Sequence, residues 1–145
     1  PGIRARVASR GLGDVYKRQI DVWEPRKPLS IDEALLQELA GVYRRGETLA
    51  EQLDELWVKD KMQLMHQEAD AFRTAKNLSD DVLADLIRFF TLAEMQLPGW
   101  EAGKKNPVIY LVRILKDRDG FDPELRNWIK TNTDNRYLPY GSALA

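Results

Sequence analysis

Hydrophobic residues recur every three or four positions over most of the chain, which is the spacing of one face of an amphipathic α-helix. The first such stretch predicts a helix over residues 31–43. Ser30 and Glu33 have the spacing of a capping box at its start, and Gly46 is a suitable stop. Its apolar positions are Ile31, Leu35, Leu36, Leu39 and Val42.

A second and longer helix is predicted over about residues 49–75, because Thr48 and Glu51 repeat the capping-box spacing. Its apolar residues form two stripes. The first stripe is Leu49, Leu53, Leu56 and Trp57, and the second is Met62, Met65, Ala69 and Phe72. The run VKDK between them, with three charged residues, indicates that the buried face drifts around the helix or that the helix bends.

The third predicted helix runs from Ser79 to Leu97 and has the broadest apolar face, so we expect it at the centre of the fold. Ser79 is its expected N-cap, and Asp80 and Asp81 suit the positive end of the helix dipole. The face consists of Val82, Leu83, Leu86, Ile87, Phe90, Ala93 and Leu97, whereas Phe89 and Leu92 lie outside it.

A fourth helix follows the loop 98–106. Asn106 is placed to cap it, and Pro107 stands at the first helical position, where a missing N–H costs no hydrogen bond. The run VIYLVRIL could also be a strand, but this start and the spacing of Arg113 and Lys116 favour a helix.

A fifth helix is predicted from Asp122 to about Asn132, with Leu125, Trp128 and Ile129 facing inward. The sequence therefore predicts an all-α protein, a single compact bundle of about five helices over residues 30–132. An extended lead-in with two prolines, residues 20–29, precedes the bundle. An extended C-terminal tail, residues 133–145, follows it, and we expect this tail to dock on the bundle.

The first nineteen residues have no sustained helical or strand period. Their segment GLGDVYKRQ resembles the translated linker read-through found at the ends of metagenomic sequence fragments. This resemblance implies a non-native leader over residues 1–19 and a bacterial, metagenomic source. We therefore leave the leader out of the fold prediction.

Charge and composition narrow the functional classes. The chain has 43% hydrophobic and 31% charged residues, which is typical of a globular domain. It has no cysteine, which excludes disulfides, thiolate catalysis and cysteine-based metal sites and suits a cytoplasmic location. Residues 20–99 hold nine basic and sixteen acidic residues, a net charge of −7, and residues 100–145 a net of +2. An acidic domain is a poor general binder of nucleic acid.

Few side chains have a spacing that favours catalysis or metal binding. The one histidine, His66, has Asp70 one turn later, but no Ser, Cys or second His at a useful spacing. The Glu-x-x-His pairs of di-iron bundles are absent, since Gln63 stands three residues before His66. The sequence predicts no bound cofactor and a non-catalytic protein.

Two alternatives to a protein-binding role remain open. One is a cofactor- or phosphate-ligand-binding subunit that uses the loop 98–110. There Lys104 and Lys105 precede a helix start, where free amides of Val108 and Ile109 could help to bind an anion. Residues 113–136 could form a helix-turn-helix that reads nucleic acid, although acidic residues crowd its turn.

The C-terminal stretch NTDNRYLPYGSALA is rich in residues typical of binding hot spots. Arg136, Tyr137, Leu138 and Tyr140 either cover a groove of the bundle or contact a partner. Trp100, in the loop before the fourth helix, either seals the end of the bundle or anchors the same partner. We expect an interaction or regulatory protein whose mildly basic C-terminal end binds another protein or a second copy.

Overall fold

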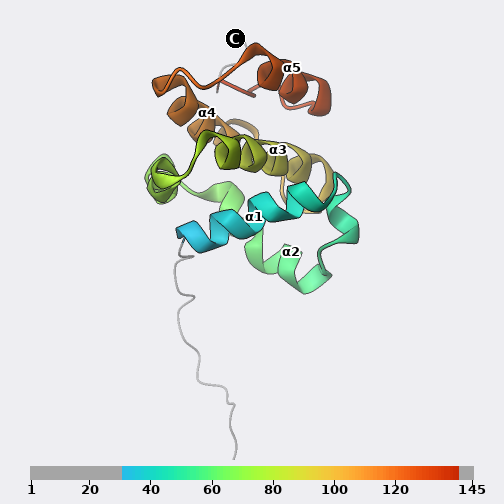
Figure 1. The fold of residues 1–145 in the computed structure, drawn as a ribbon. Coiled ribbons are helices and arrows are strands. Elements are labelled where there is room, and N and C mark those ends of the chain that lie inside the picture. Colours follow the sequence, from blue (N-terminus) through green and yellow to red (C-terminus); the bar gives the residue numbers. More distant parts are fainter. Residues whose placement is uncertain (1–30, 141–145) are drawn as a thin grey trace, which may run out of the picture.

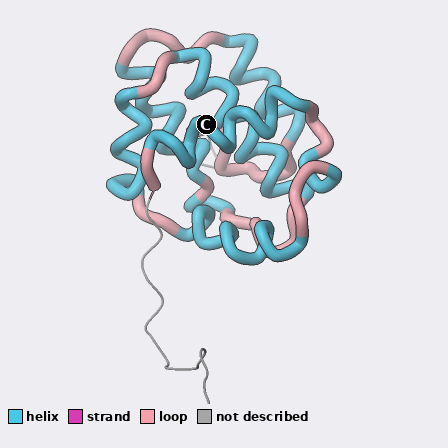
Figure 2. The backbone as a smooth tube through the Cα atoms, turned by 60° about the horizontal axis from the view of Figure 1, so that its bottom comes forward, coloured by secondary structure: helices cyan, strands magenta, loops and turns pink. Residues whose placement is uncertain are grey.

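The computed structural model describes residues 31–140, and within that range it contains helices, turns and loops but no strand (Figure 1; Figure 2). The all-α prediction is therefore confirmed. The expected leader 1–19, the lead-in 20–29, Ser30 and residues 141–145 lie outside the described residues.

Helix α3 (Asp80–Gln96) is the central element. It packs against α1 (Glu33–Arg45), α4 (Pro107–Asp117) and α5 (Pro123–Asn132), and Figure 1 shows it between α1 below and α4 and α5 above. Because neighbours cover it on several sides, Phe89 and Leu92 are buried as well as its predicted apolar face. The prediction of a central third helix is confirmed. Among the described helices, none combines the length and hydropathy needed to cross a bilayer.

Each of these four helices starts with a side-chain cap that accepts a hydrogen bond from a backbone amide of the first turn. The predicted caps of α3, α4 and α5 are confirmed. Helix α1 begins at Glu33, later than predicted, because Asp32 is its cap and accepts from the Leu35 amide at 2.9 Å. The capping residues are Asp32, Ser79, Asn106 and Asp122.

The prediction of one long helix over residues 49–75 is wrong. Four short segments replace it, and α2 is the one among them that is an α-helix. Asp54 has extended backbone angles and caps α2 by accepting from the Trp57 amide at 2.9 Å, so a helix cannot run through it. The segments are η2 (Leu49–Glu51), α2 (Glu55–Lys61), η3 (Met62–His66) and η4 (Ala69–Asn77), where η denotes a 3-10 helix.

The two apolar stripes explain these breaks. On one straight helix the stripes would face different directions, whereas each break turns the chain so that both stripes reach the same core. Leu49 from the first stripe and Met65 and Phe72 from the second are all buried. Leu56 does not follow them, since 80% of its surface is exposed.

Two tryptophans that the sequence places in the core lie at its edge. Trp57 and Trp128 are half-buried and pack against the core cluster from outside. Trp128 meets the Tyr43 ring edge-on, with 6.1 Å between ring centroids. The amphipathic spacing thus identifies the side of each helix that faces the core. It does not show how completely the neighbouring element covers the indole.

The tail is docked on the bundle as far as Tyr140, as predicted, but it is not extended, because residues 136–140 form turns. The Leu138 amide donates to the Asn135 carbonyl at 3.2 Å and closes the first of them. Leu138 is 3% exposed and belongs to the core. The Tyr140 ring lies edge-on to Phe121 at 6.0 Å, and the Lys116 ammonium lies 4.7 Å from the centre of the same ring. The tail therefore returns along α4 and the α4–α5 turn.

Candidate functional site

The polar centre of the C-terminal end is the carboxylate of Glu94, a residue in the last turn of α3 that is 8% exposed. Its Oε2 accepts hydrogen bonds from the backbone amides of Ala102 at 2.7 Å and Gly103 at 3.0 Å. Its Oε1 accepts from the side-chain amides of Asn106 at 2.9 Å and Asn135 at 2.8 Å. We call these five residues the Glu94 cluster. Four donors satisfy this buried carboxylate, and none of the Lys or Arg side chains within residues 31–140 pairs with it.

The Glu94 cluster joins the C-terminal tail to the loop that precedes α4. Asn135 Nδ2 donates both to Glu94 and to the carbonyl of Gly103, at 2.9 Å, so it connects the tail to α3 and to the loop at once. The Asn135 side-chain oxygen accepts from the Tyr137 amide at 2.9 Å, which fixes the direction of the tail after it. Loop and tail are therefore positioned relative to each other by the same carboxylate.

A shallow groove of about 370 Å³ runs between this loop and the tail. Met95, one of two large hydrophobic side chains that are exposed among the described residues, lies in it with 47% of its surface accessible. Arg136 is exposed and forms no ion pair with any residue that the structure describes. We call the groove lining the C-terminal surface; its principal residues are Met95, Glu101, Gly103, Arg136 and Tyr137.

The expected partner-binding residues have different environments. Arg136 is exposed and Tyr137 is half-buried, and both line the groove. Leu138 faces the core, and Tyr140 lies against Phe121, where it lines another hollow. Met95 is not among the binding residues predicted from the sequence. Its place outside the main apolar stripe of the third helix could have indicated an exposed apolar side chain.

Trp100 seals the bundle and is not at the surface. It is fully buried, and its indole N–H donates to the carbonyl of Val58 at 2.9 Å. Its ring stacks on Trp57 and meets Phe89 edge-on, with centroids 6.0 and 6.1 Å away. Of the two alternatives stated for Trp100, the structure therefore favours the sealing role, and Trp100 is not part of the C-terminal surface.

The anion site expected at the start of α4 lacks its free amides. The Val108 amide donates to the side-chain oxygen of Asn106 at 2.8 Å, and the Ile109 amide donates to the backbone carbonyl of Asn106 at 3.1 Å. Lys105 lies 3.6 Å from the carboxylate of Glu68. Asn106 thus uses the donors that an anion would require. Of the two lysines, Lys104 is the one that is exposed and forms no ion pair with a residue in 31–140.

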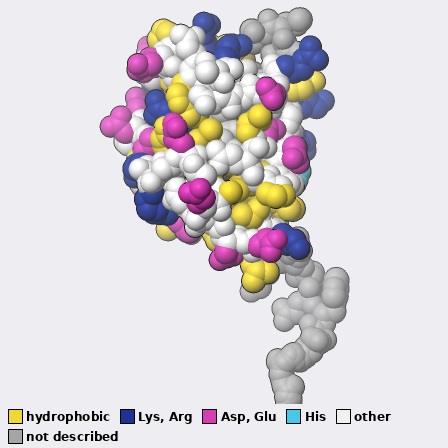
Figure 3. Space-filling view, turned by 90° about the vertical axis from the view of Figure 1, so that its right-hand side faces the viewer, with side chains coloured by type: hydrophobic (Ala, Val, Ile, Leu, Met, Phe, Trp, Pro, Cys, Tyr) yellow, Lys and Arg dark blue, Asp and Glu magenta, His cyan; other side chains and the backbone are white. Residues whose placement is uncertain are grey.

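The side chains considered for nucleic-acid binding do not form one basic strip. Arg126, Asn127 and Lys130 are exposed on α5, whereas Arg113 lines a cleft between η4 and α4. On the face shown in Figure 3, acidic and basic side chains are interspersed. A phosphate backbone requires clustered cations, so this arrangement does not strengthen the nucleic-acid alternative.

His66 is exposed at the end of η3, and Asp70 pairs with Arg73 at 2.8 Å. No group of three or more His, Asp or Glu side chains is placed to hold a metal ion within residues 31–140.

An arginine–aromatic cluster that sequence analysis missed lies where α1, α3 and α5 meet. The Arg88 guanidinium lies 6.0 Å from the centre of the Tyr43 ring and 5.8 Å from that of Trp128. Burial raises the pKa of Tyr43, and the nearby Arg88 partly opposes this effect. Asp85 binds the Arg44 guanidinium at 2.6 Å and lies 3.7 Å from that of Arg88. We interpret the cluster as a contact that holds the three helices together, because its charged groups already pair with one another.

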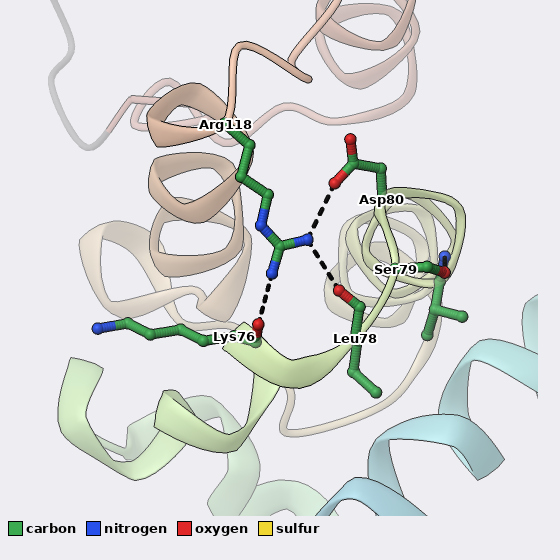
Figure 4. Close-up of polar contacts among 6 residues, drawn as sticks. Lys76, Leu78, Ser79, Asp80 and Arg118 are labelled. Atoms are coloured by element: carbon green, nitrogen blue, oxygen red, sulfur yellow. Dashed lines mark hydrogen bonds and ion pairs between the residues drawn. The ribbon is translucent and has the colours of Figure 1, made fainter.

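Arg118, just after α4, connects three elements through its guanidinium (Figure 4). One nitrogen donates to the Leu78 carbonyl at 2.8 Å and to the Asp80 carboxylate at 2.9 Å. The other donates to the Lys76 carbonyl at 2.6 Å. Arg118 therefore fastens the end of α4 to the end of η4 and the start of α3.

We expect Arg118→Lys to lower the free energy of unfolding by about 1–2 kcal/mol, because an ammonium cannot reach all three acceptors in the geometry of a guanidinium. Urea unfolding followed by circular dichroism measures the change. Arg113→Lys, at an exposed position on α4, is the matched control and should hardly change the free energy of unfolding. Equal stability of the two variants would contradict a fastening role for Arg118.

Comparison with models of protein families, with curated proteins and with solved structures finds no match to this chain.

Proposed function

We propose that this is a non-catalytic interaction or regulatory protein that binds another protein through its C-terminal surface. The observation that carries the proposal is the Glu94 cluster, which holds the tail and the loop before α4 in one arrangement. A surface that is ordered before binding loses little conformational entropy when a partner docks.

The composition of the C-terminal surface supports the same proposal. Methionine, tyrosine and arginine are enriched where proteins bind one another, and all three line this groove. Met95 supplies a flexible apolar contact, while Arg136 offers a guanidinium with no carboxylate partner among the described side chains. Glu101 opposite gives the groove both signs of charge. A groove of about 370 Å³ suits a short segment of a partner with one anchoring side chain.

The test is capture of partner proteins by the full chain and by Arg136→Glu, followed by mass spectrometry and by affinity measurement with the recovered protein. Arg136 is exposed, so the substitution should leave the fold intact, which circular dichroism checks. We expect at least about a tenfold loss of affinity, the effect of removing a hot-spot arginine.

Arg113→Glu is the matched control, because it makes the same charge change at an exposed position outside the C-terminal surface. A partner that is lost by Arg136→Glu and kept by Arg113→Glu supports the proposal. A partner kept by both variants, or lost only by Arg113→Glu, contradicts it. Loss only with Arg113→Glu, together with binding that weakens steeply with salt, would instead support the nucleic-acid alternative.

A further inference from the structure

The sulfur atoms of this sequence belong to three methionines, because it contains no cysteine. A peroxide oxidises the thioether of a methionine to a sulfoxide, which turns a flexible apolar side chain into a polar one. The reaction requires that the oxidant reach the sulfur. Burial in the folded protein therefore decides which of the three methionines reacts.

Two of the methionines are shielded by the fold. Met65 is fully buried in the core. Met62 is half-buried, and the turn after α3 lies directly against the end of its side chain. A Cβ added at Gly99 in this turn would lie 2.6 Å from the Met62 methyl carbon and 3.5 Å from its sulfur. Extensive oxidation of these two side chains requires the protein to open.

Met95 is the methionine that solvent reaches without any change in the fold. It has 47% of its surface accessible and lines the groove of the C-terminal surface. The residue before it, Glu94, is held by the Ala102 and Gly103 amides and by Asn135. The last turn of α3 is thus anchored, and the Met95 side chain stays in the groove whether its sulfur is oxidised or not.

We propose that Met95 is a redox-sensitive modification site, at which oxidation by a peroxide releases the partner from the C-terminal surface. This inference rests on the function proposed above for that surface. A sulfoxide brings a strongly polar oxygen into the groove where the partner would otherwise find an apolar contact. Covering that oxygen without a new hydrogen bond opposes binding.

The chemistry is a two-electron transfer that can be reversed. The thioether sulfur supplies the electron pair, and the O–O bond of hydrogen peroxide breaks. One oxygen atom becomes the S=O oxygen of Met95, and the other leaves as water. A methionine sulfoxide reductase restores the thioether, with two thiols oxidised to a disulfide and the oxygen released as water.

The first measurement follows the modification itself and needs no partner. The folded full chain is treated with hydrogen peroxide, and mass spectrometry of its peptides gives the rate at which each methionine gains an oxygen atom. We expect Met95 to react at least about tenfold faster than Met65, with Met62 between them. Protein oxidised at Met95 should keep its melting temperature, because this side chain lies outside the core. Reaction of Met62 or Met65 ahead of Met95 would overturn the proposal.

The second measurement is of affinity. The probe is a peptide selected on the unoxidised chain from a random-peptide library and retained if Arg136→Glu weakens its binding. Oxidation of Met95 should weaken binding of this peptide at least about tenfold, and treatment with the reductase should restore it. Excess peptide should slow the oxidation of Met95, because the bound peptide covers the groove.

Two leucine variants assign the effect to one sulfur. Each variant is compared before and after peroxide, so that any change in its starting affinity cancels. Met95→Leu should show no loss of affinity on peroxide treatment, whereas the matched control Met62→Leu should show the same loss as the wild type. Circular dichroism checks that both variants are folded.

The possible failures are distinguishable. Selective oxidation of Met95 with unchanged affinity would overturn the regulation and leave the proposed function standing. A loss of affinity that persists in Met95→Leu would overturn it as well. If the library yields no peptide that depends on Arg136, the proposed function fails, and the regulation fails with it even if Met95 is oxidised first.

Discussion

Replacing Trp100 with alanine is expected to lower the free energy of unfolding by about 3–5 kcal/mol, the range found when a large aromatic core side chain is removed. Trp100 is fully buried and contacts the rings of Trp57 and Phe89. Its loss leaves a cavity between α2 and α3, and the carbonyl of Val58 loses its donor. Urea unfolding followed by circular dichroism measures the change.

Two further variants separate the contributions to this loss. Trp100→Phe keeps most of the apolar contact but removes the N–H, so we expect about 1–3 kcal/mol from the unsatisfied carbonyl and the smaller ring. Trp57→Ala removes a half-buried indole and should cost less than Trp100→Ala. An effect of Trp100→Ala below about 1 kcal/mol would mean that this indole is exposed and available to a partner.

The second large effect is expected for Glu94→Gln, which changes one atom of a nearly isosteric side chain. The variant keeps one acceptor oxygen and directs an NH₂ group at two of the four donors. The side chains of Asn106 and Asn135 cannot turn to accept from it, because their oxygens already accept the amides of Val108 and Tyr137. We expect a loss of about 2–4 kcal/mol, since buried donors remain without acceptors.

Glu101→Gln is the control for Glu94→Gln, because Glu101 is a nearby exposed carboxylate that forms no ion pair with any residue in 31–140. It should change stability by no more than about 0.5 kcal/mol. Asn135→Ala should lose less than Glu94→Gln, and the double variant should lose less than the sum, because both changes act on one set of hydrogen bonds. Additive effects would show that the tail docks independently of Glu94.

The sequence predicts the helices that carry their own start signals. The positions of Ser79, Asn106 and Asp122 give the beginnings of α3, α4 and α5, because a cap acts within one turn of its own helix. The prediction of one long helix over residues 49–75 is wrong because it passes over a cap that starts a new helix inside that range. Asp54 is this cap, but beside Glu51 and Glu55 it also has the appearance of one more carboxylate on an exposed helix face.

The Glu94 cluster was predictable only in part. Glu94 lies four residues after Phe90 and three before Leu97, so its place on the buried stripe of α3 was visible in the sequence. A carboxylate there must find donors. Its partners Asn106 and Asn135 lie 12 and 41 residues away, and no local spacing relates them to it. The same limit applies to an apolar groove lined by Leu53, Met62 and Leu97, which forms only where α2, the segment around η2 and the turn after α3 meet.

The succession of η2, α2, η3 and η4 has a consequence for local unfolding. Short 3-10 segments have poorer hydrogen-bond geometry than an α-helix, and each break removes part of the cooperative ladder. Side chains such as Leu64 and Phe72, rather than the backbone, hold these segments in place. Amide hydrogens of residues 49–77 should therefore exchange with solvent faster than those of α3, through partial openings that leave the α1–α3–α4 core closed. Residues 49–77 can then rearrange at a lower free energy than the α1–α3–α4 core.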